Sequence, residues 1–121
     1  MTLLSPLRVV QITDMHLFAS TEQQLLGLPT LKSFRSVLTQ VAELTPRPHL
    51  LLLTGDLSQD GKPESYQLLQ NAFAELGIPT YWLPGNHDCF PVMERVLGGG
   101  AVFNQKSFQV GGWHFLLLNS Q

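Results

Sequence analysis

Three short polar motifs in this sequence carry side chains that commonly bind metal ions, and each follows an apolar run. The motifs are Asp14-Met15-His16, Gly55-Asp56 and Gly85-Asn86-His87-Asp88. Asp14 and His16 are one residue apart, so in extended backbone they point to the same side and can reach one cation. Asp56 has two carboxylate oxygens and can bridge two cations roughly 3.5–4 Å apart, the separation used in two-metal phosphoester hydrolysis. We expect Asn86 to offer an amide oxygen to the second cation.

The two residues after Asn86 are expected to be catalytic. Histidine is a common general acid in enzymes, so His87 can donate a proton to a leaving oxygen or stabilise charge on a phosphoryl group. Asp88 can orient that imidazole. The chemistry indicated is attack of an activated water on phosphorus, with two cations neutralising charge on the oxygens. Oxygen and imidazole ligands together suit Mn, Fe or Zn better than Ca or Mg.

Each motif taken alone also has a purely structural interpretation. An Asp or His after a strand is often a turn residue, Asn86 alone can be a left-handed turn residue, and Asp88 alone can cap a helix. The metal interpretation is favoured because all three motifs occur in order behind three apolar runs. His49 and His114 lie at or within apolar runs with no second ligand nearby, so we expect them to be structural.

The apolar runs before the motifs predict three strands, over Leu7–Thr13, His49–Thr54 and Thr80–Leu83. The first strand is too densely apolar for a half-exposed edge strand. A strand-helix-strand-helix-strand order favours parallel pairing, and open α/β sheets bind ligands at the carboxyl ends of their strands. We therefore expect an α/β fold whose three motifs converge at one edge of the sheet.

Two helices are expected between these strands. Leu31, Phe34, Leu38 and Val41 recur at helical spacing after Thr30, a predicted N-cap, and prolines follow the helix. A second apolar stripe, with a proline in its first turn and a glycine stop, predicts the other helix. The stripe and its boundaries are Pro63, Tyr66, Leu69, Phe73, Leu76 and Gly77.

Glycines, a proline and short apolar runs predict the structure of the remaining segments. Residues 19–29 are polar and irregular, with Gly27 and Pro29 as breakers. Apolar residues at 92–97 predict a short helix, and the glycine run 98–100 is a connector, since it lacks the lysine and strand-to-helix setting of a phosphate loop. Gly111-Gly112 predicts a hairpin between 107–110 and 113–119.

Composition narrows the class of protein. The 121 residues are 44% apolar and 13% charged, which fits one globular domain over residues 1–121. A net charge of -2 without a basic stripe gives no support for nucleic-acid binding. No run reaches the roughly 20 apolar residues of a membrane span. Cys89 is the single cysteine and is more typical of a small buried apolar residue than of a nucleophile. Because one cysteine forms no internal disulfide and no apolar run spans a membrane, we expect a cytoplasmic location and no membrane association.

The three motifs together resemble the first signature blocks of the calcineurin-like metallophosphoesterases. Within that superfamily, the amino-acid sequence around these motifs is most similar to that of the bacterial class III cyclic-AMP phosphodiesterases. The segments that carry this likeness are Gln11–Phe18, Thr54–Asp60, Trp82–Asp88 and Leu116–Gln121. The resemblance implies two divalent ions, Fe or Mn, and hydrolysis of 3′,5′-cyclic AMP to AMP.

The same resemblance implies residue roles. Asp14 and His16 would bind the first metal, Asp56 would bridge, and Asn86 would bind the second. The substrate phosphate would lie across both ions and touch His16, Asp56, Asn86 and His87. Asn119 stands where the family usually has Asp.

The resemblance also implies a longer protein. The family has later histidine blocks, including Gly-His-x-His, that supply further ligands and belong to a second half of a four-layer αββα sandwich. The chain, residues 1–121, therefore resembles a truncated metallophosphoesterase domain that corresponds to the amino-terminal half of the family's fold. A sheet face left apolar by a missing partner sheet would favour self-association.

Two other functions stay open at this point. The first is an inactive fragment or pseudoenzyme that keeps a partial metal site for structure or partner binding. The second is a nucleotide-binding α/β module without metal, which the lack of a glycine-rich fingerprint after the first strand disfavours.

Overall fold

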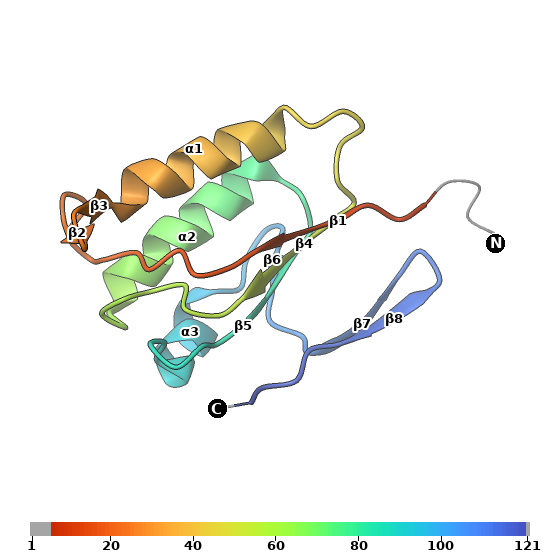
Figure 1. Cartoon of the computed structure of the whole chain (residues 1–121). Helices are drawn as coiled ribbons and strands as arrows, with labels where there is room; N and C mark the ends of the chain where they lie inside the picture. Colours follow the sequence, from red (N-terminus) through yellow and green to blue (C-terminus); the bar gives the residue numbers. More distant parts are fainter. Residues whose placement is uncertain (1–5, 121) are drawn as a thin grey trace.

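The computed structural model describes residues 6–120. Gln121, the last residue of the segment Leu116–Gln121 that carries part of the family resemblance, therefore lies outside the described residues. A parallel four-stranded sheet forms the centre, with strand order β1-β4-β5-β6. The strands are β1 Val9–Ile12, β4 Leu50–Thr54, β5 Thr80–Leu83 and β6 Val102–Phe103. The predicted α/β class is confirmed, and the three strands predicted from the sequence, β1, β4 and β5, are parallel as expected (Figure 1).

One face of the sheet packs against helices. The register pairs Ile12 with Leu53 and Leu53 with Trp82, so these side chains form one row across three strands. All three are buried. The Phe34 and Phe73 rings of two helices meet 5.6 Å apart above this face. Burial of this apolar row against the helices stabilises the sheet through the hydrophobic effect.

The two predicted helices are α1 Thr30–Ala42 and α2 Pro63–Leu76, which lie side by side on that face (Figure 1). Pro63 occupies the first turn of α2, and Gly77 ends it in a left-handed conformation with φ of 76°, as expected. Thr30 is not the N-cap of α1. The chain is still extended at Pro29, and Thr30 is the first helical residue and is buried.

The predicted short helix is α3 Phe90–Val96, which places Met93 in the core. The chain then enters β6, a two-residue strand that the sequence analysis missed. The predicted hairpin follows as β7 Ser107–Val110 and β8 Trp113–Leu116, joined through two glycines. It lies on the opposite side of the sheet from α1 and α2 (Figure 1).

Aromatic rings connect this hairpin to the second face of the sheet. Tyr81 of β5 stacks on Phe108 with ring centroids 3.5 Å apart, and Phe108 stacks on Phe115 at 5.2 Å. Phe103 stacks on the Tyr81 ring at 5.2 Å. The hairpin thus covers part of the second face, while Trp113 of β8 remains 63% exposed.

Two expectations about exposure and irregularity are wrong. β1 is an edge strand of the described sheet, and Val9 is 39% exposed. The segment expected to be irregular contains a small hairpin, β2 Gln24–Leu25 and β3 Leu28–Pro29. Its two-residue turn has Leu26 and Gly27 at φ of 51° and 82°. Leucine is not a residue that normally signals such a turn, which is why the pattern was missed.

The described residues contain no helix that is both long and apolar enough to cross a membrane.

Candidate metal centre

The loop after β1 is bonded to the loop after β4 through the backbone. The Asp14 N–H donates to the Gly55 carbonyl at 2.9 Å, and the His16 N–H donates to the Asp56 carbonyl at 3.0 Å. Leu17 continues this pairing with the carbonyl of Leu57 at 3.0 Å. These bonds bring the first two predicted motifs together at the carboxyl edge of the sheet, as expected.

Asp14, His16 and Asp56 form a cluster suited to a cation. Each contributes one ligand atom, and these atoms all lie within 4.8 Å of one another. The His16 Nε2 atom lies 3.5 Å from an Asp14 carboxylate oxygen. The His16 side chain is 19% exposed and that of Asp14 56% exposed. The group therefore lies open to solvent on the Asp14 side and is enclosed on the His16 side.

The backbone at all three residues is strained. Asp14, His16 and Asp56 have φ of 58°, 49° and 50°, in the left-handed region that side-chain-bearing residues rarely adopt. Each such conformation costs about 1–3 kcal/mol and persists where the surrounding structure imposes it. This concentration of strain at the three clustered residues is typical of a functional site.

Asp56 also contacts the loop after β5. Its Oδ1 atom accepts the His87 backbone N–H at 3.0 Å. A Cβ atom on Gly85 would lie 2.3 Å from the same oxygen and 2.4 Å from the Asp56 nitrogen. Only glycine allows this approach, which places the third motif against the first two.

The Asn86 side chain faces the Asp56 carboxylate. In one orientation, the Asn86 amide nitrogen donates to both Asp56 oxygens at 3.2 Å. In the other orientation, the amide oxygen faces those two acceptors with no proton between them. A cation held between Asp56 and Asn86 would favour the second orientation, because both groups would then be its ligands. The Asn86 amide therefore lies where it could share a cation with the Asp56 carboxylate.

His87 is exposed and lies next to the cluster. Its ring meets the His16 ring edge to face, with centroids 5.4 Å apart. The predicted site residues Asp14, His16, Asp56, Asn86 and His87 are thus brought together by the fold. Among them, His87 has the imidazole that reaches solvent beside the cluster.

Asp88 has a different position from the one expected. Its carboxylate accepts backbone N–H groups of Leu57 at 3.2 Å, Ser58 at 2.9 Å and Gly85 at 2.8 Å. The Tyr66 hydroxyl donates to it at 2.8 Å. With four donors, none from the His87 imidazole, this carboxylate connects the loop after β4 to the loop after β5. These contacts of the Asp88 carboxylate therefore join the two loops, and none of them is with the His87 imidazole.

Sequence reasoning missed two residues that contact the site. Tyr66 was predicted only as a core residue of α2; it is fully buried, and its hydroxyl accepts the Cys89 N–H at 2.9 Å while donating to Asp88. Burial, and then the charge of Asp88, raise the pKa of the Tyr66 hydroxyl, so it remains a neutral donor. Gln59 bonds His16. Neither residue belongs to a spacing pattern that signals a ligand partner.

The two other histidines make structural contacts. The Arg8 N–H donates to Nδ1 of His49 at 2.9 Å, and Nε2 of His114 bonds the Ser107 hydroxyl at 2.7 Å. Cys89 is partly buried and is not part of a disulfide. None of these three residues belongs to the metal-competent group found among the described residues.

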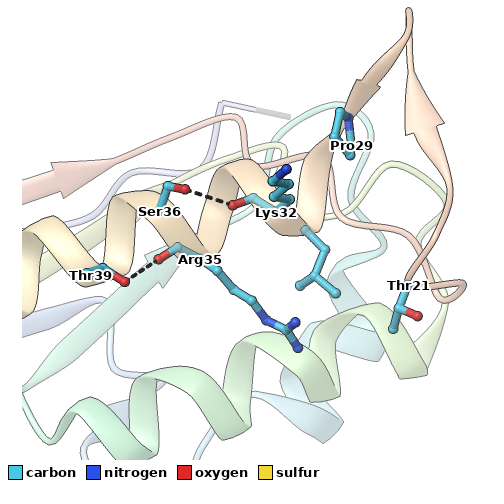
Figure 2. A pocket seen from close by; sticks show the side chains of 7 residues that line it. Thr21, Pro29, Lys32, Arg35, Ser36 and Thr39 are labelled. Atoms are coloured by element: carbon cyan, nitrogen blue, oxygen red, sulfur yellow. Dashed lines mark hydrogen bonds between the residues drawn. The ribbon is translucent and has the colours of Figure 1, made fainter.

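Two hollows lie on the helical side of the molecule and share no residue with the cluster. One of about 310 Å³ lies along α1, and another of about 680 Å³ lies between α1 and α2. Figure 2 shows the first hollow, where Arg35 extends from α1 toward α2. Its Ser36 and Thr39 hydroxyls donate to the carbonyls of Lys32 and Arg35 within the helix. The metal-competent group at the sheet edge therefore lies outside both hollows.

Comparison with known proteins agrees with this geometry. The family model described as calcineurin-like phosphoesterase matches residues 7–117. A 3′,5′-cyclic-nucleotide phosphodiesterase of Nostoc sp. is 54% identical over 95% of this chain and 43% of the relative. A 3′,5′-cyclic adenosine monophosphate phosphodiesterase of Vibrio vulnificus is 41% identical over 95% of this chain and 42% of the relative. The Escherichia coli K12 protein of the same name is 40% identical over 94% of this chain and 42% of its own length.

The chain therefore spans about two fifths of the length of these curated relatives. The matched region includes all three motifs and the strands that carry them. With the motifs at one sheet edge and a metal-competent cluster among them, sequence and geometry agree, and the chain belongs to the calcineurin-like phosphoesterase family.

Proposed function

We propose that this chain carries the metal site of a phosphodiesterase that hydrolyses 3′,5′-cyclic AMP to AMP. The observation that supports this most directly is the convergence of Asp14, His16 and Asp56 within 4.8 Å. The relatives whose names state cyclic-nucleotide phosphodiesterase activity match over nearly the whole chain. Because the chain spans only part of those relatives, their activity is transferred here as a proposal.

The proposed metal ligands are Asp14 and His16 for the first cation, Asp56 for both, and Asn86 for the second. Iron or manganese suits this mixture of imidazole and oxygen atoms. When bound, the two cations would supply an activated water and would neutralise charge on the phosphoryl oxygens. The described residues thus offer three protein ligands to one cation and two to the other.

The remaining roles belong to this chain's own side chains. His87 is exposed next to the His16 ring, and we propose that it holds a proton for the leaving oxygen. The substrate phosphate would contact the edge formed by His16, Asp56, Asn86 and His87. Asp88 holds the loops that carry these groups at a fixed distance through its bonds to the backbone.

Two ligands are few for the second cation, since divalent transition metals take four to six. We therefore propose that this set is incomplete and that water, substrate or further polypeptide completes it. The chain by itself would then show little turnover. The alternative function, a partial metal site kept for structure or partner binding, is favoured by the same ligand count.

Two further parts of the proposal concern the setting of the protein. The single cysteine allows no internal disulfide within the chain, which supports a reducing compartment such as the cytoplasm. Trp113 and Leu116 on β8 are 63% and 64% exposed, and they support self-association on the hairpin side of the sheet.

Metal analysis and a hydrolysis assay test the proposal together. We expect the chain to bind one equivalent of Mn²⁺ tightly and a second weakly, Asp14→Ala to lose the first site, and Asp56→Ala to lose both. Glu22→Ala, which removes another exposed carboxylate away from the cluster, is the matched control and should bind as the unchanged chain does. Binding of one equivalent favours the partial-site alternative, and binding of none excludes both functions. Cyclic-AMP turnover equal to that of a full-length relative would contradict the incomplete ligand set.

A further inference from the structure

We propose that Gln59 is a positioning residue that holds the His16 imidazole in the tautomer with its proton on Nδ1. The Gln59 side-chain oxygen lies 2.8 Å from His16 Nδ1. An amide oxygen only accepts hydrogen bonds, so Nδ1 must carry the proton in this pair. The lone pair of the neutral ring then lies on Nε2, the nitrogen that faces Asp14. This inference deepens the proposed function, because it rests on His16 as a metal ligand.

Gln59 is itself held in place by the segment that carries His16. Its backbone N–H donates to the carbonyl of Leu17, the next residue after His16, at 2.8 Å. Leu17 also pairs with Ser58 as an isolated parallel bridge, and the Ser58 hydroxyl donates to the Leu17 carbonyl at 3.3 Å. Leu17 and Ser58 are both fully buried. The amide therefore approaches His16 from a fixed backbone rather than from a mobile loop.

The other side of the ring explains why the tautomer matters. Nε2 of His16 lies 3.5 Å from an Asp14 oxygen, longer than a good N–H to oxygen hydrogen bond. With the proton on Nδ1, the Nε2 lone pair and the carboxylate face each other without a proton between them. That arrangement is unfavourable by itself and becomes favourable when a cation binds both atoms. In the opposite tautomer, the Nε2 proton would have to be removed before His16 could bind metal.

Such a bond from the second nitrogen of a metal-binding histidine fixes ring orientation and raises ligand basicity, and its loss costs about 10- to 100-fold in metal affinity. Asp56 cannot provide this bond, because its contact with His16 runs through the backbone carbonyl and the His16 N–H. Gln59 therefore makes the contact at Nδ1 of His16, whereas Asp14 faces Nε2 and Asp56 contacts only the His16 backbone.

The first test needs no substitution. In the metal-free chain, labelled with ¹⁵N at histidine, long-range ¹H–¹⁵N correlation at a pH where the rings are neutral reports each tautomer. We expect His16 with its proton on Nδ1. His49 is an internal reference, because its Nδ1 accepts the Arg8 N–H and its proton must therefore be on Nε2. A His16 spectrum with the proton on Nε2 would overturn the inference, whatever the metal and activity measurements show.

Substitution then tests the consequence for metal binding. Gln59→Leu removes the acceptor at similar size, and we expect the His16 proton to shift toward Nε2 and Mn²⁺ affinity at the first site to fall about 10- to 100-fold. Gln59→Glu keeps an acceptor and should restore both the tautomer and the affinity. Gln67→Leu is the same change at a glutamine on the exposed face of α2, whose amide nitrogen donates to Asn71. It should alter neither the His16 tautomer nor the Mn²⁺ affinity. Unchanged affinity in Gln59→Leu would contradict the proposed role.

These outcomes separate the inference from the proposed function. A chain that binds no metal but shows the Nδ1 tautomer removes the function and leaves the Gln59 contact intact. A chain that binds Mn²⁺ through His16 with the proton originally on Nε2 keeps the function and removes the inference. If Gln59→Leu fails to fold, the spectrum of the unchanged chain still decides.

Discussion

Two regions of this molecule are held together by different interactions. At the carboxyl edge of the sheet, the loops after β1, β4 and β5 are joined by backbone hydrogen bonds and by the Asp88 carboxylate with its four donors. The β7–β8 hairpin is attached to the opposite face through stacked rings of Tyr81, Phe108 and Phe115. The first region has directional bonds to buried groups, and the second has apolar contacts at a half-exposed surface.

This difference explains why the chemistry lies where it does. Hydrogen bonds fix distances and angles, so the polar edge can hold three left-handed residues in place and keep ligand atoms within reach of one ion. Ring stacking is less directional and tolerates sliding. We therefore expect substitutions at the polar edge to reduce both stability and metal binding, and substitutions at the hairpin to act locally.

The largest effect is expected for Asp88→Ala. It leaves the N–H groups of Leu57, Ser58 and Gly85 and the hydroxyl of Tyr66 without their acceptor, and we expect a loss of about 3 kcal/mol in the free energy of unfolding. Urea denaturation measures this value. Glu22→Ala is the exposed control and should stay within about 0.5 kcal/mol. If Asp88→Ala were equally neutral, the polar edge would not be the more rigid region.

Gly85→Ala should follow, with a loss of about 2 kcal/mol. The new Cβ would lie 2.3 Å from the Asp56 carboxylate oxygen, so the two loops must separate. We expect Mn²⁺ affinity, measured by titration calorimetry, to fall as well. Gly98→Ala is the matched control, because its Cβ would approach Asn104 only to 3.9 Å. Metal binding retained in Gly85→Ala would show that the close approach is not needed for the site.

Phe108→Ala should cost about 1 kcal/mol and act on the hairpin. It removes the ring stacked between Tyr81 and Phe115. We expect faster amide hydrogen exchange in β7 and β8, with exchange in β4 and Mn²⁺ affinity unchanged. Leu118→Ala, at an 80% exposed side chain, is the control. A loss of metal affinity in Phe108→Ala would contradict the separation of the two regions.

The last expected effect is a change in how stability depends on pH, and it concerns Lys106, which precedes β7 and lies over the Trp82 ring, 3.5 Å from its centroid. Burial lowers the pKa of Lys106 from 10.5 to about 8, although the charge of Glu94 raises it. Between pH 8 and 10.5 the unfolded chain binds the proton more readily, so this residue makes stability rise with pH over that window. Denaturation midpoints of the unchanged chain and Lys106→Met should therefore differ in slope there. Parallel curves would contradict the shift.

The amino-acid pattern alone was enough to predict the three strands that carry the motifs, the three helices and the chemical groups of the site, but not β6 or the β2–β3 hairpin. Apolar runs that end in Asp14, Asp56 and Asn86 specify strands with ligands at their carboxyl ends, because hydrophobic patterning is a local property. Pro63 and Gly77 mark the limits of α2 for the same reason, since both act through their own backbone dihedrals. The motifs also sufficed to identify the family.

Which side chains contact each other depends on the fold of the whole chain. Asp88 bonds Ser58 across 30 positions, and Gln59 bonds His16 across 43. No local pattern encodes these pairs, because they depend on parallel register and on loop conformations that bring distant residues together. The same reason explains why Asp88 contacts the backbone of two loops through its carboxylate, and not the His87 imidazole as was expected. Its acidic side chain follows from the sequence, whereas its partners follow from the packing of three strand ends.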